Sequence, residues 1–135
     1  MAEMLSLSLE QLARVADLCL PPWRHAVRRS EPCSAEHEPG GDAALIPLDC
    51  TLRLEARDGE GVRQPQHDLE LEIYRSGAEL NLMLSRVAEE QAPLLWHGRH
   101  PVWLDGESGE RRERPADGLP LEAFSRRLRA LLAVE

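Results

Sequence analysis

Three segments in the middle of the chain alternate between apolar and polar residues with a period of two. They run from Leu48 to Ala56, from Leu69 to Ile73 and from Leu80 to Leu84. This alternation is typical of β-strands that bury one face and leave the other in water. Because the loops between the segments are short, we expect the three strands to pair in chain order as an antiparallel meander.

A helical period replaces this alternation near both ends of the chain. Ser8 and Gln11 have the spacing of a capping box, which predicts a helix that Pro21 and Pro22 end. The apolar stripe of this helix comprises Leu9, Leu12, Val15, Ala16 and Cys19. Pro120 lies in the first turn of a second predicted helix. The apolar stripe of that helix comprises Leu121, Phe124, Leu128, Leu131 and Leu132.

A tight hairpin is predicted between Leu94 and Leu104. Gly98 and Arg99 fit a two-residue loop of type II′, which has glycine at its first central position. In this register Trp96 faces Pro101. A short, highly charged return strand is expected to follow from Glu110 to Arg114.

The remaining segments connect these elements. Trp23 to Arg29 is predicted to form a short helical turn, and residues 31–44, rich in proline, glycine and charge, an exposed loop. The whole chain, residues 1–135, is then one domain. Its predicted class is α+β, with an antiparallel meander sheet of five or six strands and the N-terminal and C-terminal helices packed on one face.

Composition excludes several kinds of chemistry. The chain has 16 arginines and no lysine, so it can form neither a Schiff base nor the phosphate loop of Walker A proteins. Its net charge of -8 opposes binding to a nucleic-acid backbone. No segment approaches the run of about 18 apolar residues that a membrane span needs. We therefore expect a cytoplasmic bacterial protein with reduced thiols that binds no membrane.

The histidines and cysteines form no recognisable site. His97 and His100 flank the predicted turn, but zinc would need at least a third ligand. Cys33 and His37 lie four residues apart without a group to orient them. Cys19 and Cys50 lie on apolar faces, where cysteine acts as a small core residue. We expect no metal, no cofactor and no enzymatic activity.

The hairpin is apolar on both faces, and Trp96 and Trp103 are predicted to share one of them. That face is either buried beneath the helices or available to another protein, since tryptophan and arginine are enriched at binding hot spots. The candidate binding residues are Trp96, Arg99, Trp103, Arg111 and Arg112. The predicted function is a non-catalytic protein-binding module, such as an assembly factor or a chaperone-like adaptor, whose partner is another protein or a second copy of the chain.

Two other functions remain open. One is an enzyme or small-ligand-binding protein with a pocket between the sheet and the helices, which a cavity lined by convergent polar groups would favour. The other is a single-strand nucleic-acid binder that stacks bases on the sheet, which the negative charge opposes.

Sequence resemblance adds an expectation about the C-terminal third. The segments that carry it are Val102 to Asp105, Ser108-Gly109, Arg114-Pro115 and Leu121 to Leu128. This region is similar to small uncharacterised proteins of cyanobacteria, a resemblance that implies no particular activity. The chain also resembles the acidic class of type III secretion chaperones, small α+β proteins that bind an extended client.

Overall fold

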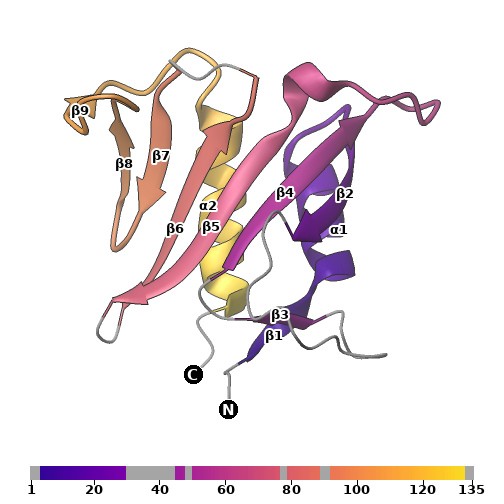
Figure 1. Cartoon of the computed structure of the whole chain (residues 1–135), viewed down its shortest axis with the longest axis horizontal. Coiled ribbons are helices and arrows are strands. Elements are labelled where there is room, and N and C mark those ends of the chain that lie inside the picture. The colour runs from indigo at the N-terminus through magenta and orange to yellow at the C-terminus, as the bar shows by residue number, and fades with distance from the viewer. Residues whose placement is uncertain (1–3, 30–44, 48–49, 77–78, 89–91, 133–135) are drawn as a thin grey trace.

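The computed structural model describes residues 4–29, 45–47, 50–76, 79–88 and 92–132 (Figure 1). The elements in chain order are β1 (Met4–Ser8), α1 (Leu9–Cys19), β2 (Arg24–Arg29), β3 (Leu45–Pro47), β4 (Cys50–Arg57), the 3-10 helix η2 (Pro65–His67), β5 (Leu69–Ser76), β6 (Glu79–Arg86), β7 (Leu94–His97), β8 (Pro101–Leu104), β9 (Arg111–Arg112) and α2 (Leu119–Leu132). The predicted exposed loop, residues 31–44, lies outside the described residues.

The predicted antiparallel meander is confirmed. Strands β4, β5 and β6 pair in chain order, with Leu52 opposite Leu71 and Leu71 opposite Leu84. They form the centre of a seven-stranded sheet with the order β2-β4-β5-β6-β7-β8-β9. The prediction of five or six strands was too low for this sheet. A separate two-stranded ladder, β1-β3, was also not predicted.

The extra strand of the main sheet is β2, which the sequence analysis assigned to a helical turn. That assignment is wrong, because β2 pairs with β4 along its whole length, from Arg24 opposite Arg57 to Arg29 opposite Leu52. A carboxylate oxygen of Asp17 in α1 accepts the backbone N–H of His25 at 2.7 Å. Pairing with a distant strand therefore decides the conformation of a segment too short to show its own period.

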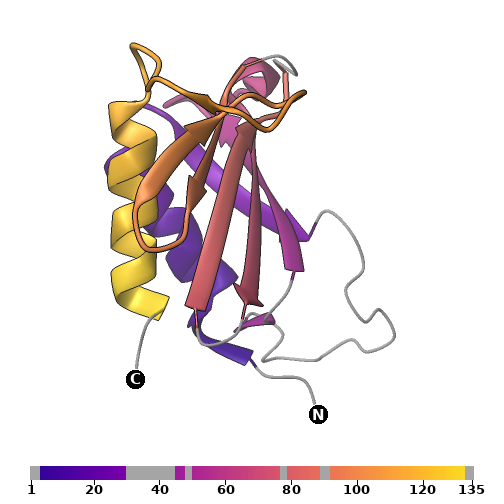
Figure 2. The same ribbon diagram turned by 90° about the vertical axis from the view of Figure 1, so that its left-hand side faces the viewer.

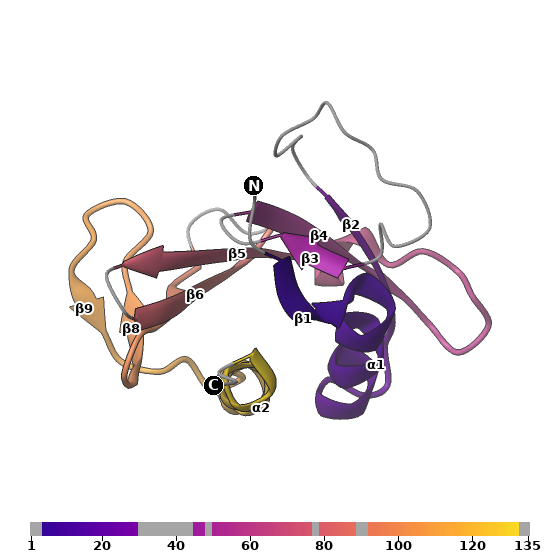
Figure 3. The ribbon, with the colours of Figure 1, turned by 90° about the horizontal axis from the view of Figure 1, so that it is seen from below.

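Both helices pack on the same face of the sheet, as predicted (Figures 2 and 3). The predicted capping box is present at the start of α1, where Ser8 and Gln11 bond to each other's backbone N–H. The core between helices and sheet is rich in leucine, and Phe124 of α2 is its largest fully buried side chain. Leu131 is 42% exposed, so its predicted place in the buried stripe of α2 is wrong. No described helix lies on the other face, which we call the open face (Figure 2).

The hairpin has a different register from the one predicted. His97 pairs with Pro101, so the loop has three residues, Gly98 to His100, rather than two. Trp96 consequently faces Val102, not Pro101. A shift of one residue sends every side chain of a strand to the other face. Trp103 therefore points toward the helices and is buried, while Trp96 lies on the open face.

Candidate functional site

Trp96 is held in a fixed position on the open face. Its indole Nε1 donates a hydrogen bond to the hydroxyl of Tyr74, at 3.0 Å. Because Tyr74 is in β5 and Trp96 in β7, the ring spans the intervening strand β6. A Cβ atom on Gly98 would lie 2.9 Å from both the Trp96 ring and Asn81 Oδ1. Only glycine leaves room for the ring at this point of the turn.

Trp96 is one of four apolar side chains that the hairpin places on the open face. Leu94 pairs with Leu104, and Trp96 pairs with Val102, in two cross-strand pairs on the open face. All four are half-buried. We call these four residues the hairpin patch. A half-buried group of this kind keeps contact with water in the free protein and gains from being covered.

A shallow pocket of about 420 Å³ adjoins the patch at the tip of the hairpin. Its walls include Trp96, Val102, Arg99 and His100, together with Glu79 and Asn81 of β6. Arg99 is exposed, and its Nε lies 3.3 Å from Glu79 Oε2. An exposed ion pair contributes little to stability, so Glu79 holds Arg99 only weakly.

The structure separates the five predicted binding residues. Trp96 and Arg99 line the same pocket. Arg111 and Arg112 form the exposed edge strand β9, opposite Leu104 and Trp103. Trp103 is only 4% exposed, and its Nε1 donates to Glu122 Oε2 at 2.6 Å. The prediction that Trp96 and Trp103 share a face is therefore wrong.

His97 lies beneath the hairpin tip, on the face toward the helices. It is 4% exposed, and its Nδ1 lies 2.7 Å from the hydroxyl of Ser125. Burial, together with the nearby Arg129 and Arg126, lowers the pKa of His97 from 6.5 to about 4. The folded protein therefore holds this imidazole neutral at physiological pH. The sequence analysis placed His97 beside a two-residue turn, a position that does not indicate burial.

Stability should depend on pH through His97. As pH falls from 6.5 to about 4, the unfolded chain binds a proton at His97 that the folded chain does not. Unfolding becomes easier in this window, by up to about 3 kcal/mol. Urea titrations near neutral pH and near pH 4 measure the loss. In His97→Gln the dependence should be clearly smaller, and an identical dependence in both proteins would rule out His97 as its source.

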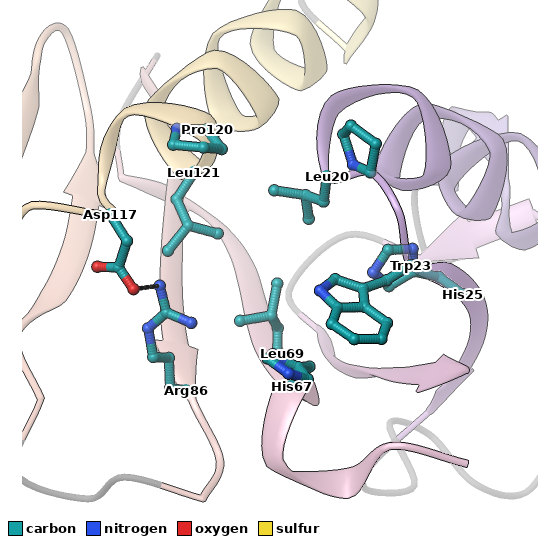
Figure 4. Close-up of a pocket in the computed structure, with 10 residues that line it drawn as sticks. Leu20, Trp23, His25, His67, Leu69, Arg86, Asp117, Pro120 and Leu121 are labelled. Atoms are coloured by element: carbon teal, nitrogen blue, oxygen red, sulfur yellow. Dashed lines mark hydrogen bonds and ion pairs between the residues drawn. The ribbon is translucent and has the colours of Figure 1, made fainter. Parts of the chain in front are cut away.

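A second cavity, of about 220 Å³, opens between the end of α1, the start of α2 and the sheet (Figure 4). Trp23 and His67 stack on one side of it, with ring centroids 4.1 Å apart. On the other side, Arg86 Nη2 donates to Asp117 Oδ2 at 2.8 Å. Sequence reasoning missed these residues, because they come from four separate segments that only the fold brings together.

The cysteines and histidines form no metal site in the part of the chain that is described, where no group of three or more His, Cys, Asp or Glu residues could hold an ion. Cys33 and His37 lie outside the described residues. Burial raises the pKa of the Cys19 thiol, and the positive charge of Arg127 opposes part of this rise. A raised pKa reduces the thiolate form and makes Cys19 a poor nucleophile.

These features define a class of protein: an α+β domain with one sheet face covered by two helices and an open face that carries an apolar patch. The chain belongs to the family of the domain of unknown function DUF8659, which it matches over residues 9–131. No curated protein and no solved structure matches it. No helix of the described residues is long and apolar enough to cross a membrane. The likeness of the C-terminal third to cyanobacterial proteins stays a prediction.

Proposed function

We propose that this protein is a non-catalytic protein-binding module whose hairpin patch docks a segment of another protein. The observation that carries the proposal is the state of Trp96. Its ring is half-buried, bonded to Tyr74 and pressed against Gly98. An aromatic side chain that is already fixed loses little conformational entropy when a partner covers it.

The chemistry of the patch specifies the partner segment. An aliphatic or aromatic side chain of the partner fills the pocket between Trp96 and Val102. A carboxylate nearby in the partner takes the place of Glu79 on Arg99, in a charge-assisted hydrogen bond. Arg111, exposed in the neighbouring edge strand opposite Leu104 of the patch, attracts the same acidic segment, whereas Arg112 lies opposite Trp103 on the helical side. The partner is therefore an apolar segment flanked by acidic residues.

Selection from a random peptide library displayed on phage tests this proposal. Wild-type protein should enrich peptides that combine an aromatic or aliphatic residue with aspartate or glutamate. Trp96→Ala should weaken binding of the selected peptide by about 30-fold, as expected for a hot-spot residue. Arg99→Glu should weaken it by about fivefold, since it turns attraction into repulsion at an exposed position.

Leu131→Ala is the matched control, because Leu131 is an exposed apolar side chain on the helical side of the molecule. It should bind the peptide as the parent does. The proposal fails if no peptide is enriched, or if Trp96→Ala binds as well as the control. A dimer in sedimentation experiments that Trp96→Ala dissociates would instead assign the patch to a second copy of the chain.

A further inference from the structure

The cavity between the two helix ends has an apolar interior and a polar rim. Leu20, Leu69 and Leu121 contribute side chains from α1's C-terminal cap, the sheet and α2 (Figure 4). Trp23 and Arg86 lie at opposite sides of this apolar group. We call this cavity the helix-end pocket. It lies on the helical side of the sheet, away from the hairpin patch, and the inference below does not depend on the proposed function.

Two groups that line the helix-end pocket, the Trp23 indole and the Arg86 guanidinium, only donate hydrogen bonds. The edge of the Trp23 ring that carries Nε1 faces the space between Leu20 and Leu69 (Figure 4). An indole N–H and a guanidinium can donate but cannot accept hydrogen bonds. His25, also in the wall, has its Nδ1 engaged by Asp17 at 3.0 Å. A ligand that pairs with Arg86 must therefore bring an acceptor.

The Arg86 guanidinium is available to such a ligand. Its present partner, Asp117, has a side chain that is 69% exposed, whereas the Arg86 side chain is 20% exposed. Asp117 can thus turn into solvent while Arg86 stays in the wall. A carboxylate offers two oxygens in the geometry that guanidinium prefers, and it is ionised at neutral pH.

We propose that the helix-end pocket binds a small monocarboxylate with an apolar body. Its carboxylate replaces Asp117 on Arg86, and its apolar body lies among the three leucines, toward the Trp23 ring. The volume of about 220 Å³ limits the ligand to a single ring or a short branched chain. Pockets for drug-sized ligands occupy about 300–1,000 Å³.

Benzoate is the probe, and benzamide is its neutral isostere. In NMR spectra of the full chain, benzoate should shift the indole N–H signal of Trp23, assigned by its loss in Trp23→Phe. The indole signals of Trp96 and Trp103 should not move. Benzamide should bind about tenfold more weakly, because it lacks the charge that Arg86 recognises.

Three variants decide the role of the guanidinium. Arg86→Gln should weaken the binding of benzoate by about tenfold or more. Asp117→Asn should strengthen the binding of benzoate, because a neutral amide competes less well for Arg86. Arg112→Gln, a control in the exposed strand β9, should bind benzoate like the parent.

The inference is overturned by any of three results. The first is no shift of the Trp23 signal at about 10 mM benzoate, a concentration that would reveal even a millimolar ligand. The second is equal binding of benzamide. The third is weaker binding by Asp117→Asn, which would mean that Asp117 holds the pocket together rather than competing with the ligand.

Discussion

Asp68→Ala is expected to lower the free energy of unfolding by about 3–5 kcal/mol, the largest loss that we expect for a single charged residue among those that the structure describes. The carboxylate is fully buried. It accepts the backbone N–H of Ala56 at 2.8 Å and two N–H groups of Arg63 at 2.9 and 3.0 Å. Removing it leaves the buried backbone N–H of Ala56 without its acceptor and takes two hydrogen bonds from the Arg63 guanidinium. Urea denaturation monitored by circular dichroism measures the loss.

The charge of Asp68 makes a second, independent check possible. Burial raises the pKa of Asp68, but the hydrogen bonds from Arg63 and Ala56 outweigh it and hold the pKa below its ordinary value of 3.8. The stabilisation is therefore present at neutral pH and is lost as pH falls through the lowered pKa.

Glu10→Ala is the control for Asp68→Ala, because Glu10 lies in an exposed ion pair with Arg14. It should lower the free energy of unfolding by less than about 1 kcal/mol. Equal losses in the two variants would contradict this account of Asp68.

Trp103→Ala is expected to cost about 3–5 kcal/mol, as for other buried tryptophans. The indole is 4% exposed and donates to the buried Glu122 carboxylate. Its ring also lies against Gly118, where an added Cβ would come within 2.7 Å of it. Truncation leaves a cavity beneath α2 and removes a donor from a buried charge.

Trp96→Ala is the matched variant for Trp103→Ala, since it removes the same side chain from the opposite face of the hairpin. Because Trp96 is only half-buried, its removal should lower the free energy of unfolding clearly less than removal of Trp103 does. Thermal and urea unfolding of the two variants side by side give the comparison. A Trp103→Ala protein that melts like the parent would mean that this ring is not part of the core.

The central strands could be predicted from sequence because each shows its own period. In β4 and β5 alternate residues such as Leu52, Leu54 and Leu71 face the core, and the pattern is visible without knowledge of the partner strand. Strand β2 could not be predicted in this way. Its six residues run Arg-His-Ala-Val-Arg-Arg, which show no clear alternation, and its conformation comes from pairing with β4 and from the Asp17 cap.

The hairpin register could not be predicted from turn rules alone. Glycine at position 98 fits a two-residue turn, but the shifted register buries Trp103 beside Glu122 and packs Trp96 over Gly98. Tertiary packing of two large rings outweighs the local turn preference. Residue type alone was enough to predict Trp96 and Arg99 as candidate binding residues. The placement of Trp103 on the opposite face from Trp96 involves its contact with Glu122, 19 positions along the chain, which residue type does not show.

The helix-end pocket had no sequence signal. Trp23 precedes an edge strand, His67 ends a 3-10 turn, and Arg86 and Asp117 are 31 positions apart. None of these residues stands in a motif. They meet only because the end of α1 and the start of α2 lie close together on one face of the sheet (Figure 4).

Hydrogen exchange of the full chain, with and without the peptide selected on phage, tests most directly whether the hairpin patch is the binding surface. The proposed function predicts slower exchange in the peptide complex for residues 94–104, which carry the patch and the turn. Exchange in α2, residues 119–132, should be unchanged. Protection confined to α1 and α2, with none in the hairpin, would contradict the proposal.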